Sequence, residues 1–272
     1  MSLTITRLDL ELTGRCPLQC LHCYADSGPT GGHGVMTASD WLNVLEQGTT
    51  LGVTHIQLIG GEPTAYPAFA QILAAALDYG LTVEVFSNLL ATSYYSDRAD
   101  QHDQVTGRAG SHARTRANIA EALARGIPVR AAIVDVQDGQ RVQQAIADLK
   151  RQGVETIGTD GVRPYGRGTG ARAQDDVSKL CGRCGHGKAA ISPDGDVWPC
   201  VMSRWMVAGN VREEPLADIL YGPAWRKLVA TVPAPRPGRA CNPDCKPSTG
   251  DGGDCAPAET ETCDPSFCNP DE

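Results

Sequence analysis

The chain has 272 residues and a formal net charge of −8, and this composition excludes several classes of protein. An acidic chain lacks the clustered Lys and Arg that phosphate binding needs, so we expect no nucleic-acid partner. No apolar run approaches the roughly 18 residues of a membrane-spanning helix, and no signal sequence opens the chain, so we expect a soluble, cytoplasmic protein without a membrane partner. Eleven cysteines in such a chain indicate metal ligation rather than disulfides.

Short apolar runs alternate with amphipathic stretches from residue 5 to about 160, which is the pattern of βα units around a parallel sheet. In chain order, we expect strands at 5–12, 55–59, 82–87, 90–95, 128–134 and 155–158. We expect helices at 38–50, 68–79, 113–125 and 139–152. A glycine follows each helix within two residues, as a left-handed C-terminal cap requires. Thr37 and Asp40 form a capping box before the first helix.

The connection between the third and fourth strands is unusually short. Residues 83–88 run almost directly into 89–95, whereas a crossover between parallel neighbours needs roughly a dozen residues. Either the two runs form one bent strand, or a helical segment is absent from the sequence. We favour the absent helix.

Cys16, Cys20 and Cys23 follow the first strand with the spacing CxxxCxxC. Three thiolates can hold three irons of a four-iron cluster and leave the fourth iron open, whereas an electron-transfer cluster is normally closed by four cysteines. A zinc knuckle is the alternative, but it would need a fourth ligand at close spacing, and the ring of His22 would point away from its flanking cysteines. The run Cys16-Pro-Leu-Gln-Cys20-Leu-His-Cys23-Tyr24 resembles the signature of radical S-adenosylmethionine (SAM) enzymes, in which the open iron chelates the amino and carboxylate groups of SAM.

This resemblance implies an α/β fold, a partial (β/α)6 TIM-like barrel, which we assign to residues 1–170. It also implies a reaction in which the reduced [4Fe-4S] cluster cleaves SAM to a 5'-deoxyadenosyl radical. The radical then abstracts hydrogen from a C–H bond of the substrate. The implied electron donor is a flavodoxin or ferredoxin.

Gly60-Gly61-Glu62-Pro63 follows the second strand and looks like the GGE motif of the same family. By resemblance these residues bind SAM: the glycines let the backbone approach it closely, and Glu62 accepts hydrogen bonds from its amino group. Ser87 and Asn88, which end the third strand, and Arg130, on the fifth, are expected to contact the ribose or carboxylate of SAM. The alternative for each is an ordinary polar residue at a strand end.

A second group of cysteines follows residue 170. Residues 192–195 read as a hairpin turn that presents Cys200, and large apolar side chains almost vanish after residue 236, so metal ligation would have to order the tail. Residues 171–272 resemble the SPASM or twitch extension of radical SAM enzymes. By resemblance one auxiliary [4Fe-4S] cluster is held by Cys181, Cys184, Cys200 and Cys263, and a second by Cys241, Cys245, Cys255 and Cys268.

The tail spacing departs from the usual one, which leaves alternatives open. A twitch-type extension with a single auxiliary cluster would leave several tail thiols free, and zinc is a further alternative for the tail cysteines.

The overall layout is similar to actinobacterial enzymes that tailor natural products, neomycin C epimerases among them. We therefore favour an isomerase that epimerises a carbohydrate or aminoglycoside in antibiotic biosynthesis, and an acidic surface would suit a cationic aminosugar. Epimerisation needs a hydrogen donor, usually a thiol. Because three plus eight ligands use all eleven cysteines, one tail cysteine would have to be unligated, and we choose Cys241 or Cys245.

Tyr95 is expected to touch the substrate if Tyr94 points out of the barrel, with packing as the alternative. Arg163 and Arg167 either line the substrate cavity or pair with acids. Three other functions remain open. The chain could be a maturase that crosslinks or epimerises a ribosomally made precursor peptide, a radical dehydrogenase, or a non-catalytic iron-sulfur or zinc scaffold.

Overall fold

The computed structural model describes residues 4–87, 91–169 and 176–234. The chain divides into two compact units. Unit 1 comprises Met1–Pro17, Ser27–Phe86 and Gln174–Pro235, and unit 2 comprises Leu18–Asp26, Ser87–Ala173 and Arg236–Glu272. Each unit is therefore built from segments that are distant in sequence. Our boundary at residue 170/171 follows sequence character and stays a prediction.

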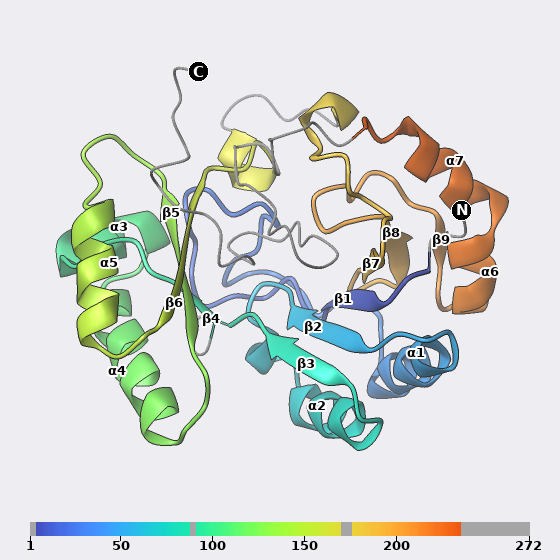
Figure 1. Cartoon of the computed structure of the whole chain (residues 1–272), viewed down its shortest axis with the longest axis horizontal. Coiled ribbons are helices and arrows are strands. Elements are labelled where there is room, and N and C mark those ends of the chain that lie inside the picture. Colours follow the sequence, from blue (N-terminus) through green and yellow to red (C-terminus); the bar gives the residue numbers. More distant parts are fainter. Residues whose placement is uncertain (1–3, 88–90, 170–175, 235–272) are drawn as a thin grey trace. The chain divides into compact units, whose positions relative to one another are not determined.

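Unit 1 is built on one sheet with the strand order β3-β2-β1-β7-β8-β9 (Figure 1). The first three strands and β7 run parallel, and the last two run antiparallel. The strands are β1 (Arg7–Glu11), β2 (His55–Ile59), β3 (Thr82–Val85), β7 (Lys188–Ile191), β8 (Asp196–Trp198) and β9 (Gly209–Asn210). The central strand β1 thus leads directly into the first cysteine motif.

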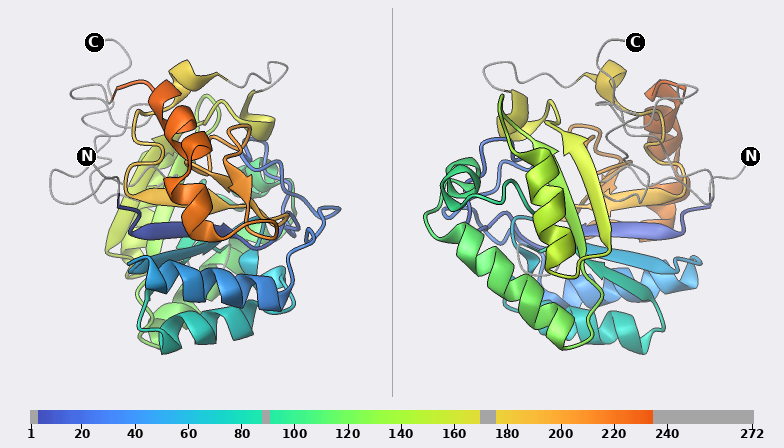
Figure 2. Two further views of the ribbon diagram at one scale, coloured as in Figure 1. Left: turned by 90° about the vertical axis from the view of Figure 1, so that its right-hand side faces the viewer. Right: turned by 60° about the vertical axis from the view of Figure 1, so that its left-hand side comes forward.

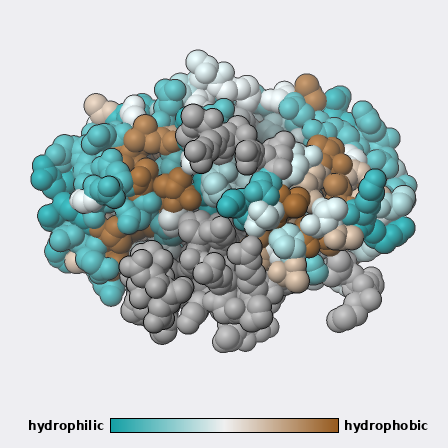
Figure 3. All heavy atoms as spheres, turned by 90° about the horizontal axis from the view of Figure 1, so that it is seen from above, coloured by the Kyte–Doolittle hydropathy of each residue, from teal (hydrophilic) through white to brown (hydrophobic). Residues whose placement is uncertain are grey.

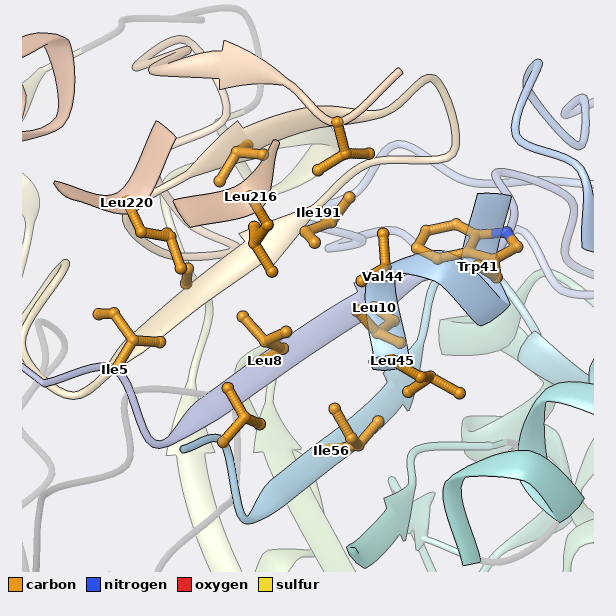
Figure 4. Packing of buried hydrophobic residues seen from close by; sticks show 14 of the residues in the cluster. Ile5, Leu8, Leu10, Trp41, Val44, Leu45, Ile56, Ile191, Leu216 and Leu220 are labelled. Carbon is orange, nitrogen blue, oxygen red and sulfur yellow. The ribbon is translucent and has the colours of Figure 1, made fainter. Parts of the chain in front are cut away.

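Among the described residues, four α-helices belong to unit 1, and α1 and α2 lie along the same side of β1, β2 and β3 (Figures 1 and 2). The helices are α1 (Ala38–Thr50), α2 (Phe69–Asp78), α6 (Leu216–Tyr221) and α7 (Pro223–Thr231). One hydrophobic core joins them to the sheet. Figure 4 shows Leu8 and Leu10 of β1 packed among Trp41 of α1, Ile56 of β2 and Leu216 of α6.

The opposite face of β1 carries Asp9 and Glu11, which are buried like their apolar neighbours. Glu11 forms an ion pair with Arg204, whose guanidinium lies 5.2 Å from the ring centroid of Trp198. Burial raises the pKa of Glu11 from 4.5 to about 7 even though Arg204 opposes the shift. The ion pair joins the strand before Cys16 to the segment after Cys200.

Unit 2 contains a parallel sheet with the order β4-β5-β6 and three helices. The elements are β4 (Ala91–Ser93), α3 (Ala99–Thr106), α4 (Ser111–Ala124), β5 (Arg130–Asp135), α5 (Val142–Arg151) and β6 (Thr156–Gly161). Figure 2 shows α4 and α5 beside the sheet. Tyr94 is fully buried there and donates a hydrogen bond of 2.6 Å to Asp148 on α5.

The six predicted strands correspond to β1–β6, all in parallel pairs, and the four predicted helices correspond to α1, α2, α4 and α5. The predicted α/β class with a partial (β/α)6 arrangement is confirmed. The capping box at Thr37 and the hairpin at 192–195 are also present. β3 and β4 belong to different sheets, and both alternatives for 83–95 stay predictions. Residues 88–90 lie outside the described residues.

The surface is mixed in polarity on the face drawn in Figure 3, where hydrophobic residues occur in small groups among hydrophilic ones. Among the described helices, none is long and apolar enough to cross a membrane.

We predict that Arg204→Met lowers the free energy of unfolding by about 3 kcal/mol at pH 8, because it leaves the buried Glu11 carboxylate without its cation. The folded-state pKa of Glu11 lies above its ordinary value, so its protonated form stabilises the fold at low pH, and that contribution is lost as the pH rises through about 7. The defect of Arg204→Met should therefore shrink at pH 6. Anaerobic urea unfolding at the two pH values measures it.

The double variant Glu11→Gln/Arg204→Met is the control, because it removes the buried charge together with its partner. It should recover most of the lost stability at pH 8. An Arg204→Met defect of equal size at both pH values would show that lost packing on Trp198, rather than the charge, causes it.

Candidate functional site

The first cysteine motif spans the division between the units, with Cys16 in unit 1 and Cys20 and Cys23 in unit 2. None of the three forms a disulfide bond. Cys16 is buried, and its backbone N–H donates to the carbonyl oxygen of Gly28 at 3.0 Å.

In unit 1 the backbone of the GGE segment lies directly against the residues before Cys16. The N–H of Gly61 donates to the carbonyl oxygen of Thr13 at 2.6 Å, and the N–H of Glu62 donates to that of Arg15 at 2.9 Å. A Cβ at Gly61 would lie 2.4 Å from the Arg15 carbonyl oxygen and 3.0 Å from the Cβ of Cys16. Only glycine fits this approach, and the bare backbone beside Cys16 suits a ligand with amino and carboxylate groups.

Glu62 is 4% exposed, and its carboxylate caps the short 3-10 turn Pro63–Ala65. One carboxylate oxygen accepts hydrogen bonds from the Thr64 hydroxyl at 2.6 Å and from the Thr64 N–H at 3.2 Å. These contacts fix the orientation of the carboxylate that the sequence assigns to the SAM amino group.

In unit 2 the segment 18–26 is held by the C-terminal end of α3. The N–H groups of Gln19 and Leu21 donate to the carbonyl oxygens of Thr106 and Val105, at 2.9 and 3.1 Å. These carbonyls belong to the last turn of the helix, where carbonyl oxygens lack partners within the helix. The cysteine loop therefore pairs with backbone groups that the helix itself leaves open.

Tyr94 and Tyr95 contact different parts of unit 2, in agreement with the expectation that adjacent strand residues face opposite ways. Tyr94 belongs to the hydrophobic cluster of α4, α5 and β5. The Tyr95 hydroxyl lies 3.3 Å from Nε2 of His22, within the cysteine loop. The predicted contact of Tyr95 with substrate stays a prediction, whereas its contact with the cysteine loop was not foreseen.

The ring of His22 packs edge-on against Tyr95, with centroids 5.2 Å apart. Burial, and secondarily the positive charge of Arg167, lowers the pKa of His22 to about 4. The imidazole is therefore neutral at pH 7. Its position between two cysteines was visible in the sequence, but its partner Tyr95, 73 residues further along the chain, was not.

The remaining residues predicted to contact SAM are Ser87, Asn88 and Arg130, and their positions differ. Ser87 is buried, and Asn88 lies outside the described residues. Arg130 is the first residue of β5, at its amino end, whereas sites in barrels of this kind form at the carboxyl ends of the strands. This placement does not support the expected contact between Arg130 and the SAM carboxylate.

Arg163 and Arg167 both pair with acids, as one alternative expected. Arg163 is 6% exposed and bonds Asp160 at 2.7 Å. Arg167 bonds Asp26 at 2.9 Å, and it also contacts the cysteine loop.

The second cysteine group brings together three of its members in unit 1. Cys184 and Cys200 are each 1% exposed, and the neighbouring thiols of Cys181 and Cys200 both influence the pKa of Cys184, which lies well above its ordinary value. The N–H of Gly185 donates to the carbonyl oxygen of Pro199 at 2.8 Å, which holds the 181–184 loop against the end of the hairpin. The other predicted ligands lie outside the described residues: Cys241, Cys245, Cys255, Cys263 and Cys268.

Within the described residues, no three His, Cys, Asp or Glu side chains converge as ligands of a single metal ion. The zinc alternative for the tail concerns cysteines beyond them. A cubane cluster carries each thiolate on a different iron, so its ligands need not meet at one point. The free, buried thiols of Cys184 and Cys200 suit that kind of group.

Comparison with known proteins gives two family matches. Residues 10–101 match the model of the radical SAM superfamily, and residues 174–246 match the SPASM iron-sulfur cluster-binding domain. Both cysteine groups thus fall within or overlap matched segments.

Two curated relatives carry the same name. The PqqA peptide cyclase of Methylorubrum extorquens (strain PA1) is 39% identical over 82 residues, or 30% of this chain and 20% of that protein. The chain thus spans about a fifth of the length of that relative. The PqqA peptide cyclase of Xanthomonas campestris pv. campestris (strain 8004) is 26% identical over 296 residues, covering 85% of this chain and 78% of that protein.

Among solved structures, Streptococcus suis SuiB bound to precursor peptide SuiA superposes with a TM-score of 0.68 at 16% identity. The match covers 84% of this chain and 67% of SuiB. At this identity the likeness shows the fold.

The two family matches agree with the fold and with the hydrogen-bonded backbone beside Cys16. The matched domains imply [4Fe-4S] clusters and SAM as cofactors. The chain carries a radical SAM domain over residues 10–101 and a SPASM iron-sulfur cluster-binding domain over residues 174–246.

Proposed function

We propose that this radical SAM enzyme is a maturase that modifies a peptide by a crosslink or an epimerisation. The observation that carries the proposal is the relative named PqqA peptide cyclase, which matches 85% of this chain. SuiB, with the same fold, was solved with a precursor peptide bound. These likenesses favour the peptide alternative of the sequence analysis over its main hypothesis.

Cys16, Cys20 and Cys23 would hold the SAM-binding cluster, and Gly61 would leave room for SAM beside Cys16. When bound and reduced, the cluster supplies the electron that cleaves SAM to a 5'-deoxyadenosyl radical. The chain's own residues would position SAM. Cys16 follows β1, and the backbone of 60–62 lies beside it. The Glu62 carboxylate, whose orientation is fixed by Thr64, would accept hydrogen bonds from the SAM amino group. We retain a flavodoxin or ferredoxin as the proposed electron donor.

Epimerisation of an aminoglycoside is the second candidate, and the net charge of −8 is the observation that favours it. Charge describes the whole chain and is shared by many acidic proteins, so it identifies a substrate less well than a likeness along most of the sequence. Both candidates share the same first step and differ in what happens to the substrate.

The deciding experiment presents both substrate classes to the anaerobically reconstituted enzyme in D2O with SAM and dithionite. The peptide arm uses short peptides encoded beside the gene, and the sugar arm uses neomycin C. We expect a peptide to lose two hydrogens through crosslinking, or to gain one deuterium at an epimerised carbon. Deuterium in neomycin C with every peptide unchanged would overturn the proposal.

We predict that Cys23→Ser abolishes reductive SAM cleavage, because a cluster-binding thiolate is lost. Formation of 5'-deoxyadenosine, measured by chromatography after dithionite reduction, should fall at least 100-fold. Cys184→Ser is the matched control in the second cysteine group, and it should retain SAM binding. Undiminished 5'-deoxyadenosine from Cys23→Ser would contradict the assignment of the first motif.

We predict that Gly61→Ala lowers both the affinity for SAM and the iron bound at the first motif, because the added Cβ would lie 2.4 Å from the Arg15 carbonyl oxygen. Equilibrium dialysis of SAM and iron analysis measure the two losses. Gly28→Ala is the control, since a Cβ there meets nothing within 4 Å. Equal SAM affinity in the two variants would show that the close approach is not needed.

A further inference from the structure

Arg167 lies in the 3-10 turn Gly166–Thr169 that follows β6, and it makes three contacts with the cysteine loop of the same unit. Its Nε donates to the carbonyl oxygen of Cys20 at 2.8 Å, and its backbone N–H donates to that of Cys23 at 2.9 Å. Its Nη1 bonds Asp26 at 2.9 Å. One residue thus binds the backbone of two cluster-binding cysteines.

This proximity is built into the backbone. Gly166 has a positive φ of 51°, and a Cβ at that position would lie 2.4 Å from the Cys23 carbonyl oxygen. The turn after β6 therefore reaches the cysteine loop only because glycine precedes Arg167. An ion pair between Arg167 and the exposed Asp26 would not by itself require the Gly166 backbone to lie so close to Cys23.

The charge of Arg167 is only partly balanced by its acid. The side chain of Asp26 is 70% exposed, whereas that of Arg167 is 24% exposed. Water screens an exposed carboxylate more strongly than a guanidinium held against protein, so Asp26 offsets only part of the potential that the Arg167 guanidinium exerts on the cysteine loop.

We propose that Arg167 sets the reduction potential of the SAM-binding cluster by holding a positive charge against the loop that carries Cys20 and Cys23. Reduction adds one electron, and no proton, to the cluster. The added negative charge is stabilised by a nearby cation, and net charge near a cluster is one of the factors that set its potential. Arg167 is thus a positioning residue that favours the reduced state. The proposal rests on the cluster of the first motif and is independent of the peptide proposal.

The test is a dithionite titration of the fully loaded enzyme, followed by electron paramagnetic resonance without any substrate. The signal that changes on adding SAM identifies the cluster of the first motif among the others. Arg167→Gln removes the charge, Arg167→Lys keeps it, and Arg125→Gln removes a 69% exposed arginine elsewhere in unit 2. Iron is counted in each variant.

We expect Arg167→Gln to shift the one-electron equilibrium about tenfold toward the oxidised cluster, which is about 59 mV. Arg167→Lys and Arg125→Gln should stay near the wild-type potential. A loaded Arg167→Gln enzyme with the wild-type potential would overturn the proposal, as would Arg167→Lys with the same shift as Arg167→Gln.

If Arg167→Gln does not retain its iron, the reduction potential of the cluster is measured in Asp26→Asn instead. Asn fits the positive φ of 52° at residue 26, and this variant removes the negative charge of Asp26 from beside Arg167, so the potential should rise. An unchanged or lowered potential in loaded Asp26→Asn would overturn the proposal. Because no step depends on peptide or sugar, failure of the peptide proposal leaves this result unaffected.

Discussion

Close approach of backbone to backbone is the constraint on which the cluster site depends in both units. In unit 1 the N–H of Gly61 reaches the carbonyl oxygen of Thr13 at 2.6 Å, and in unit 2 the N–H of Arg167 reaches that of Cys23 at 2.9 Å. A side chain at Gly61 would collide with the carbonyl oxygen of Arg15, and one at Gly166 would collide with that of Cys23. Cysteine spacing specifies the ligands, but these glycines allow the surrounding loops to hold them.

Periodicity predicted most of the sheet and its helices, because β1–β6 alternate with amphipathic segments that glycine caps terminate. It missed α3, whose sequence ADQHDQVT is mostly polar and buries only His102, Val105 and Thr106. It also missed α6 and α7, which are short and separated only by Gly222. These helices are stabilised by the elements that they pack against, which a local pattern cannot reveal.

Site residues that form contiguous motifs could be predicted from the sequence, whereas contacts between residues far apart in the sequence could not. CxxxCxxC and Gly60-Gly61-Glu62 are contiguous motifs, and the sequence identified both. Arg167 lies 147 residues from Cys20, and the pattern around it offered only pairing with acids or a place in the substrate cavity. Arg130 lies at the amino end of β5, a position within the strand that the sequence pattern did not specify, and its expected contact with SAM stays a prediction.

The SPASM match includes both cysteines that were chosen as hydrogen donors for epimerisation. The SPASM match covers residues 174–246 and so contains Cys241 and Cys245, whereas Cys255, Cys263 and Cys268 follow it. A thiolate that binds iron cannot also give up a hydrogen atom. If the chain epimerises its substrate, Cys241 or Cys245 stays the predicted donor, and the cysteine that gives up the hydrogen atom must then be one that binds no iron. A crosslinking maturase needs no such donor, so it can use every cysteine as a ligand.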